Sequence, residues 1–485
     1  MKKTYNVNKL AIFLFLVGCL MGMDLTALGV FLNGPQFLNA FGRPTPIEQG
    51  LLMGANPLGG LIGSIFYVNL SKTKGRINLF QISSLIWFVG AVVGTVVAQI
   101  WMIALARLIK GVTIGMLSIL VTSYISELFP SQIRGRTLAF VQVGYTFSIL
   151  SMHFLCVACD LIKSQLSFRL AWGLECLPAI IVYAITYWIP ESPFYLIISG
   201  NYEQAEFEYN SMARRYNKNC NENDTQTKEL NNFEIVEHYG CTEQPLTYME
   251  LLKKNSRNYV FMGCLLQIMV QCTGINIILY YITYICEMVG LTQEVKLLVS
   301  SIPYFINAIL SCCPLWYLDR VPRKSMTILG STTLSVAMIS ISIIMVTTGK
   351  KVDPIHGNKA LIWIVPRVPG IFVLVLCFLF VGVFSLTIAC IPWIYTNELL
   401  PARAKPNGFP ICMATGWIMN FTITMTCPLL MENLQWGIYL FFGGVTLILS
   451  SVIMIFFPET KEVITSQSHK TVNDLKEPRL SLEKT

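Results

Sequence analysis

Two matching sets of residues in this sequence combine a carboxylate, a proline and a cation at the same spacing. The first set is Glu127, Pro130 and Arg134, within SELFPSQIRGR. The second set is Glu398, Pro401 and Lys405, within NELLPARAKPN, and each member follows its counterpart by 271 residues. Carboxylates and cations so placed can form ion pairs that open and close. PESP at 190–193 also recurs, as PETK at 458–461, so the pattern indicates a duplicated unit.

Other ionisable residues fall within apolar stretches, where a charge is costly and therefore informative. Asp24 lies in the first stretch and Arg107 in the fourth, so the carboxylate could carry a proton that the guanidinium controls. Lys110, His153 and Glu175 are further titratable residues in or near such stretches. We expect these three at cavity edges or span ends rather than in proton coupling.

The elements that must position these residues are membrane-spanning helices. Hydrophobic residues make up 54% of the chain, charged residues only 13%, and the mean hydropathy is +0.58, which excludes an ordinary soluble globule. Apolar runs of about 20 residues can cross roughly 30 Å of hydrocarbon as helices. Twelve such spans are predicted, at 10–32, 48–69, 78–99, 101–125, 136–160, 170–189, 259–287, 295–317, 326–347, 368–396, 408–430 and 437–457. The first span is too long for a secretory leader and contains Asp24.

The distribution of lysine and arginine predicts that both termini are cytosolic, because cytosolic connections carry an excess of these residues. The bias is clearest in short connections, which hold Lys72, Lys74, Arg76, Arg134, Arg136, Arg320, Arg323, Lys324, Arg403 and Lys405. The same bias accounts for the net charge of +8, so we expect no nucleic-acid partner.

Enzymatic and metal chemistry find no support in the sequence. The 15 cysteines are scattered, mostly within spans, and show no metal-ligand spacing. No nucleophile–base pair or phosphate-binding loop is evident. We therefore expect neither an enzyme nor a protein that needs a metal or a cofactor.

A single long hydrophilic segment separates the two sets of spans. We expect helices in NYEQAEFEYNSMARRY and in PLTYMELLKKN, with the polar residues between them forming a cytosolic linker. The predicted organisation is an N-terminal six-helix bundle at 1–196, a linker at 197–257, a C-terminal six-helix bundle at 258–460 and a short cytosolic tail at 461–485.

From about residue 10 to residue 461 the chain resembles the sugar porters of the major facilitator superfamily, of fungal type. The motifs that carry the resemblance are LSKTKGR at 70–76, RLIKGVTIG at 107–115, SYISELFPSQIRG at 123–135, PESPFYL at 190–196, QCTGINIILYY at 271–281, LDRVPRK at 318–324, IPWIYTNELLP at 391–401 and PETK at 458–461. The resemblance implies an all-α membrane protein with twelve transmembrane helices in two pseudo-symmetric six-helix bundles.

The resemblance also implies a sugar site. The matching positions are Gln142, Gln271, Asn276, Asn307, Trp393 and Asn420, and Trp417 is a further aromatic residue beside the cavity. Paired donors and acceptors of amides suit sugar hydroxyls, and aromatic faces suit the C–H surface of the ring. For any single amide, a hydrogen bond between helices is the alternative.

A cytosolic gate is implied as well, formed by Arg76, Glu127, Arg134, Arg323, Glu398 and Lys405. Pairs among these residues could latch the two bundles closed on the cytosolic side, and opening inward must then break them. The alternative is that the charges only set topology. Acidic residues contribute little to orientation, so the recurring carboxylates favour the gate.

The chain departs from the family pattern at several positions. Val270 stands where the family has a second glutamine, and Ser385 where it has an acidic residue or glycine. Near the gate, the departures are Lys72, Thr122, Phe194 and Pro322. The losses at the cavity could change the preferred sugar, and those at the gate could change the balance between conformations.

These observations predict a secondary transporter of a hexose or related polyol, working by alternating access as a monomer in the bilayer. Similar proton symporters carry the Asp24–Arg107 pair, but fungal facilitators of the family carry the aspartate too, so symport and facilitated diffusion both stay open. We expect the plasma membrane, with the vacuolar membrane as alternative. A sugar sensor without flux is the second hypothesis, motivated by the departures at the gate.

Overall fold

The structure is a computed structural model that describes residues 7–32, 34–129, 131–219, 246–291, 293–352 and 363–460. Pro130 of the first repeated set, most of the polar part of the linker and the tail after residue 460 lie outside the described residues. The two helices predicted in the linker are confirmed, as α11 (Tyr202–Asn219) and α13 (Tyr248–Leu251).

The described chain is helical apart from one small hairpin. The first half comprises α1 (Val7–Gly22), α2 (Asp24–Ala27), α3 (Pro35–Phe41), α4 (Pro46–Leu70), α5 (Arg76–Thr95), α6 (Ile100–Leu128), α7 (Ser131–Asp160), α8 (Leu166–Leu174), α9 (Cys176–Ile185), η1 (Thr186–Trp188) and α10 (Pro193–Ile198). The second half comprises α14 (Lys254–Cys272), α15 (Ile275–Met288), α16 (Gln293–Leu310), α17 (Pro314–Tyr317), α18 (Arg323–Thr348), α19 (Arg367–Leu386), α20 (Ile391–Leu399), α21 (Lys405–Leu434) and α22 (Gly437–Phe456). The hairpin pairs β1 (Lys350–Lys351) with β2 (Trp363–Ile364) in antiparallel register.

Eleven helical stretches within the described residues are long and apolar enough to cross a membrane. The twelfth predicted span, 408–430, lies within α21, which is 30 residues long but is not among the eleven. This helix carries amide and hydroxyl side chains such as Asn420 and Thr424, which lower its mean hydropathy. The all-α membrane architecture is confirmed.

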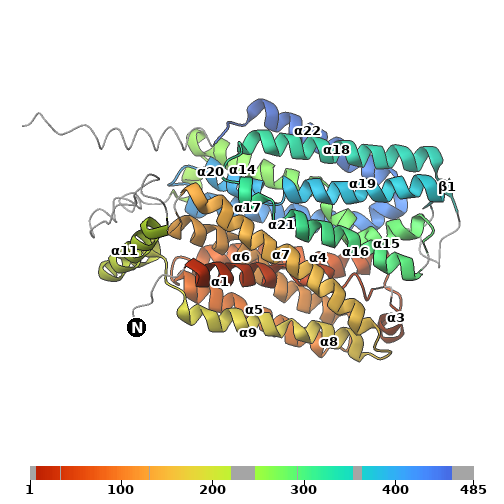
Figure 1. The fold of residues 1–485 in the computed structure, drawn as a ribbon, viewed down its shortest axis with the longest axis horizontal. Coiled ribbons are helices and arrows are strands. Elements are labelled where there is room, and N and C mark those ends of the chain that lie inside the picture. The colour runs from red at the N-terminus through yellow and green to blue at the C-terminus, as the bar shows by residue number, and fades with distance from the viewer. Residues whose placement is uncertain are drawn as a thin grey trace, which may run out of the picture.

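The long helices lie roughly parallel to one another, and the two halves of the chain occupy opposite sides of the molecule (Figure 1). The helices from α1 to α9 lie together on one side, and those from α14 to α22 on the other. α11 lies at one end of the helices, and α3 and the β-hairpin lie at the other. We keep 1–196 and 258–460 as the proposed limits of the two bundles.

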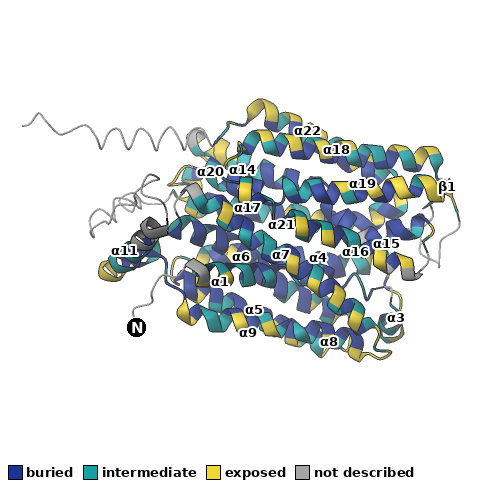
Figure 2. Cartoon of the chain, in the orientation of Figure 1, coloured by how far each residue is buried: buried dark blue, intermediate teal, exposed yellow. Residues whose placement is uncertain are grey.

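Apolar side chains are exposed on the outer faces of the helices, as a lipid-facing surface requires. On α5, for example, Leu85, Val89 and Val92 are exposed at helical spacing. Figure 2 shows such exposed positions along the outer sides of the long helices, with buried residues between the helices.

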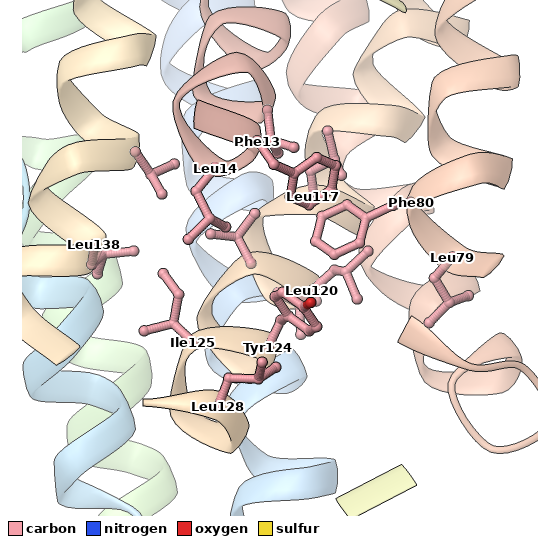
Figure 3. Close-up of a cluster of buried hydrophobic side chains, with 14 of the residues drawn as sticks. Phe13, Leu14, Leu79, Phe80, Leu117, Leu120, Tyr124, Ile125, Leu128 and Leu138 are labelled. Carbon is pink, nitrogen blue, oxygen red and sulfur yellow. The ribbon is translucent and has the colours of Figure 1, made fainter. Parts of the chain in front are cut away.

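Aromatic rings anchor the core of the first half. Phe80 of α5 packs edge-on against Phe13 of α1 and Tyr124 of α6, with ring centroids 4.9 and 5.5 Å apart (Figure 3). The Tyr124 hydroxyl donates to the carbonyl of Pro190 at 2.7 Å. This contact ties the PESP motif to the core, at the end of the first set of spans.

Small residues allow α4 and α6 to approach closely. A Cβ atom at Gly115 would lie only 2.0 Å from the carbonyl oxygen of Gly60, and one at Gly59 would lie 2.1 Å from that of Leu108. Both contacts are with backbone atoms, which cannot move aside without separating the two helices.

We therefore expect Gly115→Ala to destabilise the protein, by about 1–3 kcal/mol. The unfolding midpoint of the detergent-purified protein should fall by several degrees, as measured by intrinsic fluorescence during heating. Gly444→Ala is the matched control, because a Cβ atom there has no heavy atom within 4 Å. Equal midpoints for the two variants would contradict the packing argument.

Candidate functional site

A cavity of about 150 Å³ lies between the two halves of the molecule. It is lined by α1, α2, α6 and α7 of the first half and by α14, α15, α16, α19, α20 and α21 of the second. All seven predicted sugar-contacting residues line it, namely Gln142, Gln271, Asn276, Asn307, Trp393, Trp417 and Asn420. The sequence motifs therefore converge on one cavity.

Interrupted helices bring several of these side chains to the cavity. Between α14 and α15, Gly274 adopts a φ of +83°, which a side chain would disfavour. The break places Gln271 at the end of one helix and Asn276 at the start of the next. A second break, between α19 and α20, precedes Trp393 in the same way. Broken helices at the midplane are a recurring feature of transporter binding sites.

The amides on the cavity wall hold one another in place. Asn276 Nδ2 donates to Gln271 Oε1 at 3.3 Å and to Asn420 Oδ1 at 3.2 Å. Thr424 Oγ1 also donates to Asn420 Oδ1, at 3.0 Å. Each of these amides has further donors or acceptors. Each can therefore form a hydrogen bond between helices and also contact a ligand.

Two tryptophans supply flat apolar surface to the same cavity. Trp417 packs against α4 at Gly60, where a Cβ atom would lie 2.6 Å from the indole ring. Its Nε1 lies 3.4 Å from Ser118 Oγ, so the indole joins the two halves. Gln267, which sequence reasoning missed, also lines the cavity and donates to Thr396 Oγ1 at 2.9 Å.

The two departures predicted to affect the cavity do lie at it. Val270 is one of the lining residues. Ser385 is fully buried behind the wall, and its Oγ donates to Asn307 Oδ1 at 2.8 Å. The serine thus orients an amide that faces the cavity.

Removing this contact should weaken substrate binding through Asn307. We expect Ser385→Ala to raise the KM for sugar uptake about 3- to 10-fold, because a lost hydrogen bond is worth about 0.5–1.5 kcal/mol. Uptake kinetics would measure this, with Thr422→Ala, an exposed hydroxyl on α21, as the control. An unchanged KM would contradict a positioning role for Ser385.

Four ionisable side chains form a buried cluster behind α1 and α2. Arg107 Nη2 lies 3.3 Å from Asp24 Oδ2, as the predicted pair requires. Lys110 Nζ contacts Asp24 Oδ1 and lies 2.7 Å from Glu175 Oε2. Lys110 lines a small cavity together with Asp24 and Arg107, as the cavity-edge prediction requires, whereas Glu175 is fully buried in the interior of its span, which that prediction did not expect.

His153 is also buried, but away from this cluster. Its ring lies 4.9 Å from that of Tyr304, and neither ring nitrogen has a hydrogen-bond partner among the described residues.

The repeated motifs form equivalent ion pairs at one end of each half. Arg76 pairs with Glu127 at 2.8 Å, and Arg323 pairs with Glu398 at 3.3 Å. In each half a second carboxylate accepts from backbone N–H groups at the helix start, as favoured by the helix dipole. These are Glu191, which accepts from Arg76 at 2.8 Å, and Glu459, which accepts from Arg323 at 2.8 Å. The PESP and PETK motifs supply them.

These pairs differ from the expected latch, because each joins helices of the same half. At this end of the molecule, a hydrogen bond across the halves is made by Asp319, which precedes α18 and accepts from the Arg136 N–H at 2.9 Å. A Cβ atom at Gly135 would lie 2.3 Å from Asp319 Oδ1. Burial raises the pKa of the Asp319 carboxyl, and these backbone donors oppose that shift.

Arg134 and Lys405 lie beside a cavity at the same end of the molecule. Together with Glu398 they line a second cavity of about 590 Å³ at this end of the molecule. Arg134 Nε donates to the carbonyl of Phe129 at 2.7 Å. All six predicted gate residues thus lie at the same end of the helices, and four of them form the pairs Arg76–Glu127 and Arg323–Glu398.

Known proteins with similar sequences are transporters. Residues 10–470 match the family model described as "Sugar (and other) transporter". A probable metabolite transport protein of Saccharomyces cerevisiae is 39% identical over 461 residues, covering 95% of this chain and 85% of the relative. High-affinity glucose transporter 1 of Candida albicans is 28% identical, covering 95% of this chain and 84% of the relative.

A solved structure shares the fold. The proton:xylose symporter XylE of the major facilitator superfamily, bound to 6-bromo-6-deoxy-D-glucose, aligns with a TM-score of 0.76 at 20% identity. The alignment covers 95% of this chain and all of that chain. With the family model spanning nearly the whole sequence, the chain belongs to the sugar porter family of the major facilitator superfamily, among fungal-type members.

Proposed function

We propose that this sugar porter moves a hexose or a related polyol across a membrane by alternating access. The observation that carries the proposal is the convergence of seven amide and indole side chains, from both halves, on one cavity. Amides and indoles with few charges suit a neutral polyhydroxylated ligand. The glucose transporter among the relatives supports the substrate class.

Each part of the cavity has a proposed role. Gln142, Gln271, Asn276, Asn307 and Asn420 would bind sugar hydroxyls. Trp393 and Trp417 would pack on the C–H face of the ring, as aromatic side chains do. The contact of Trp417 with α4 adds a second task, because a rotation of the halves would move the indole relative to Ser118.

The gate at the motif-rich end would control access from the cytosol. The within-half pairs Arg76–Glu127 and Arg323–Glu398 would hold the ends of each bundle rigid, and Asp319 would close one bundle onto the other. Lysine and arginine in these loops support cytosolic termini. We further propose that the protein works as a monomer in the plasma membrane.

Uptake of labelled sugars by cells stripped of their own sugar carriers tests the proposal. A panel of hexoses, pentoses and polyols should reveal at least one that enters faster than in cells without the protein. Absence of uptake for the entire panel, with surface expression confirmed, would overturn the proposal. Sugar binding without flux, accompanied by a transcriptional response, would instead support the sensor.

A further inference from the structure

The buried cluster around Asp24 contains one more cation than the predicted Asp24–Arg107 pair requires. Its four side chains come from α2, α6 and the junction of α8 and α9. Each is at most 2% exposed. A buried charge is tolerated only when it is compensated, so the number of charges matters as much as their distances.

Lys110 is held in this cluster by specific contacts. Its ammonium lies between the two carboxylates, in contact with Asp24 Oδ1 and 2.7 Å from Glu175 Oε2. It also lies over the Trp87 ring, 5.8 Å from the centroid. A Cβ atom at Gly90 would lie 2.7 Å from the Lys110 Cγ, so the glycine makes room for the lysine stem.

Arg107 compensates only one of the two carboxylates directly. Its Nη2 lies 3.3 Å from Asp24 Oδ2, and its Nη1 donates to the Asp24 carbonyl at 3.2 Å. Asn56 Nδ2 adds a donor to Asp24 Oδ2 at 2.6 Å. Glu175 Oε1 has no hydrogen-bond partner among the described residues, so Lys110 is the group that pairs with this carboxylate.

The charges balance without a proton. Two carboxylates face two cations, so both acids can stay ionised. Without the ammonium, one carboxylate would lack a counter-charge, and the least costly remedy in a buried site is protonation. The other titratable groups that face the cluster are neutral phenol and thiol side chains, namely Tyr280 on α15, Cys156 on α7 and Cys176 on α9.

The ion pairs of the cluster would also stay intact during the transport cycle. All four charged residues belong to the first half, so a rotation of one half against the other breaks none of these ion pairs. Asp24 does not line the central cavity, although Met21 and Leu25 on either side of it do. A coupling carboxylate must change its proton affinity between the two conformations. The rotation moves Tyr280 of the second half relative to the cluster, but it leaves the ion pairs of both carboxylates in place.

We propose that the Lys110 ammonium takes the place of a coupling proton, so that this protein moves its sugar by proton-independent facilitated diffusion. Lys110 is therefore the residue that sets the coupling mode. This inference rests on the proposed sugar transport, and it decides between the two modes that the sequence left open.

The test uses the purified full-length protein in liposomes that contain a pH-sensitive dye. Labelled hexose is exchanged against an excess of unlabelled hexose inside, and proton movement is recorded with a hexose gradient alone. We expect exchange without hexose-driven proton uptake, and an exchange rate that changes less than about twofold between pH 5.5 and 7.5. Hexose-driven proton uptake by the wild-type protein would overturn the inference.

Charge variants provide the second arm. In Lys110→Met one carboxylate loses its counter-charge. We therefore expect the exchange rate to fall about tenfold for each unit of rising pH, in the range where that carboxylate ionises. The double variant Lys110→Met/Glu175→Gln restores the balance and should again be insensitive to pH. Identical pH profiles for the wild type and Lys110→Met would overturn the inference. If the single variant does not fold, the double variant and the wild-type proton measurement still decide.

Different results would overturn the proposed sugar transport and the proposed proton independence. No exchange of any hexose, pentose or polyol by the wild-type protein would remove the proposed function and this inference with it. Exchange accompanied by proton uptake would leave the proposed function standing and would overturn the inference alone.

Discussion

Replacing Asn276 by leucine is expected to reduce the uptake efficiency of the transported sugar about 10- to 100-fold. Asn276 begins α15 beside the Gly274 break and bonds both Gln271 and Asn420. Leucine has a similar volume, but it removes a hydrogen-bond donor from the partly buried amides of Gln271 and Asn420 and removes a group proposed to bind the sugar. Unsatisfied polar groups cost about 1–3 kcal/mol, which corresponds to this loss.

The measurement is the initial uptake rate at low sugar concentration, divided by the amount of protein at the cell surface. Asn433→Leu is the matched control, because Asn433 lies on α21 but is exposed and bonds only the carbonyl of Leu429 in the described structure. We expect that variant to retain wild-type uptake. Equal uptake by the Asn276 and Asn433 variants would contradict the assignment of the cavity.

Replacing Asp319 by alanine is expected to open the cytosolic side. The carboxylate accepts the Arg136 N–H, in the second turn of α7, and so bonds one half of the molecule to the other. Hydrogen bonds to charged groups contribute about 1.5–3 kcal/mol, so the balance between closed and open states should shift about 10- to 100-fold.

A cysteine introduced at Ser126 would report this shift, because Ser126 lines the second cavity, at the motif-rich end of the helices. Its alkylation in inside-out vesicles, corrected for the same protein without Ser126→Cys, should become about tenfold faster in Asp319→Ala. Asp160→Ala, at the opposite end of α7, provides the control and should leave the rate unchanged. A rate that is equal or slower in Asp319→Ala would contradict the gate.

Much of the fold could be predicted from the sequence because membrane helices leave a strong signal of length and hydropathy. Eleven of the twelve expected spans are among the membrane-crossing helices. The remaining one falls on α21, which carries the polar residues of the cavity. Polar side chains that line a binding cavity lower the mean hydropathy of the helix that carries them.

The cavity residues were predictable because family motifs name them, whereas the contacts between them were not. Ser385 could be recognised as a departure, but its bond to Asn307 depends on how α16 and α19 meet. Gln267 lay outside the motifs, and only its place one turn before Gln271 on α14 could have indicated a cavity position.

The charged residues show the limit of sequence reasoning most clearly. The recurrence of PESP and PETK predicted equivalent roles, and Glu191 and Glu459 do cap equivalent helices. The partners of Lys110 and Glu175 were missed because they lie far apart in sequence. A lysine in the middle of an apolar span, three residues after Arg107, was the available signal, since such a charge requires a partner.

The central claim is that the cavity between the halves carries sugar across the membrane. Counterflow in liposomes holding the purified protein and an excess of unlabelled hexose tests it most directly. External labelled hexose should accumulate transiently above its equilibrium level, and Asn276→Leu should abolish that excess. Labelled hexoses, pentoses and polyols that all enter no faster than into protein-free liposomes would contradict the account.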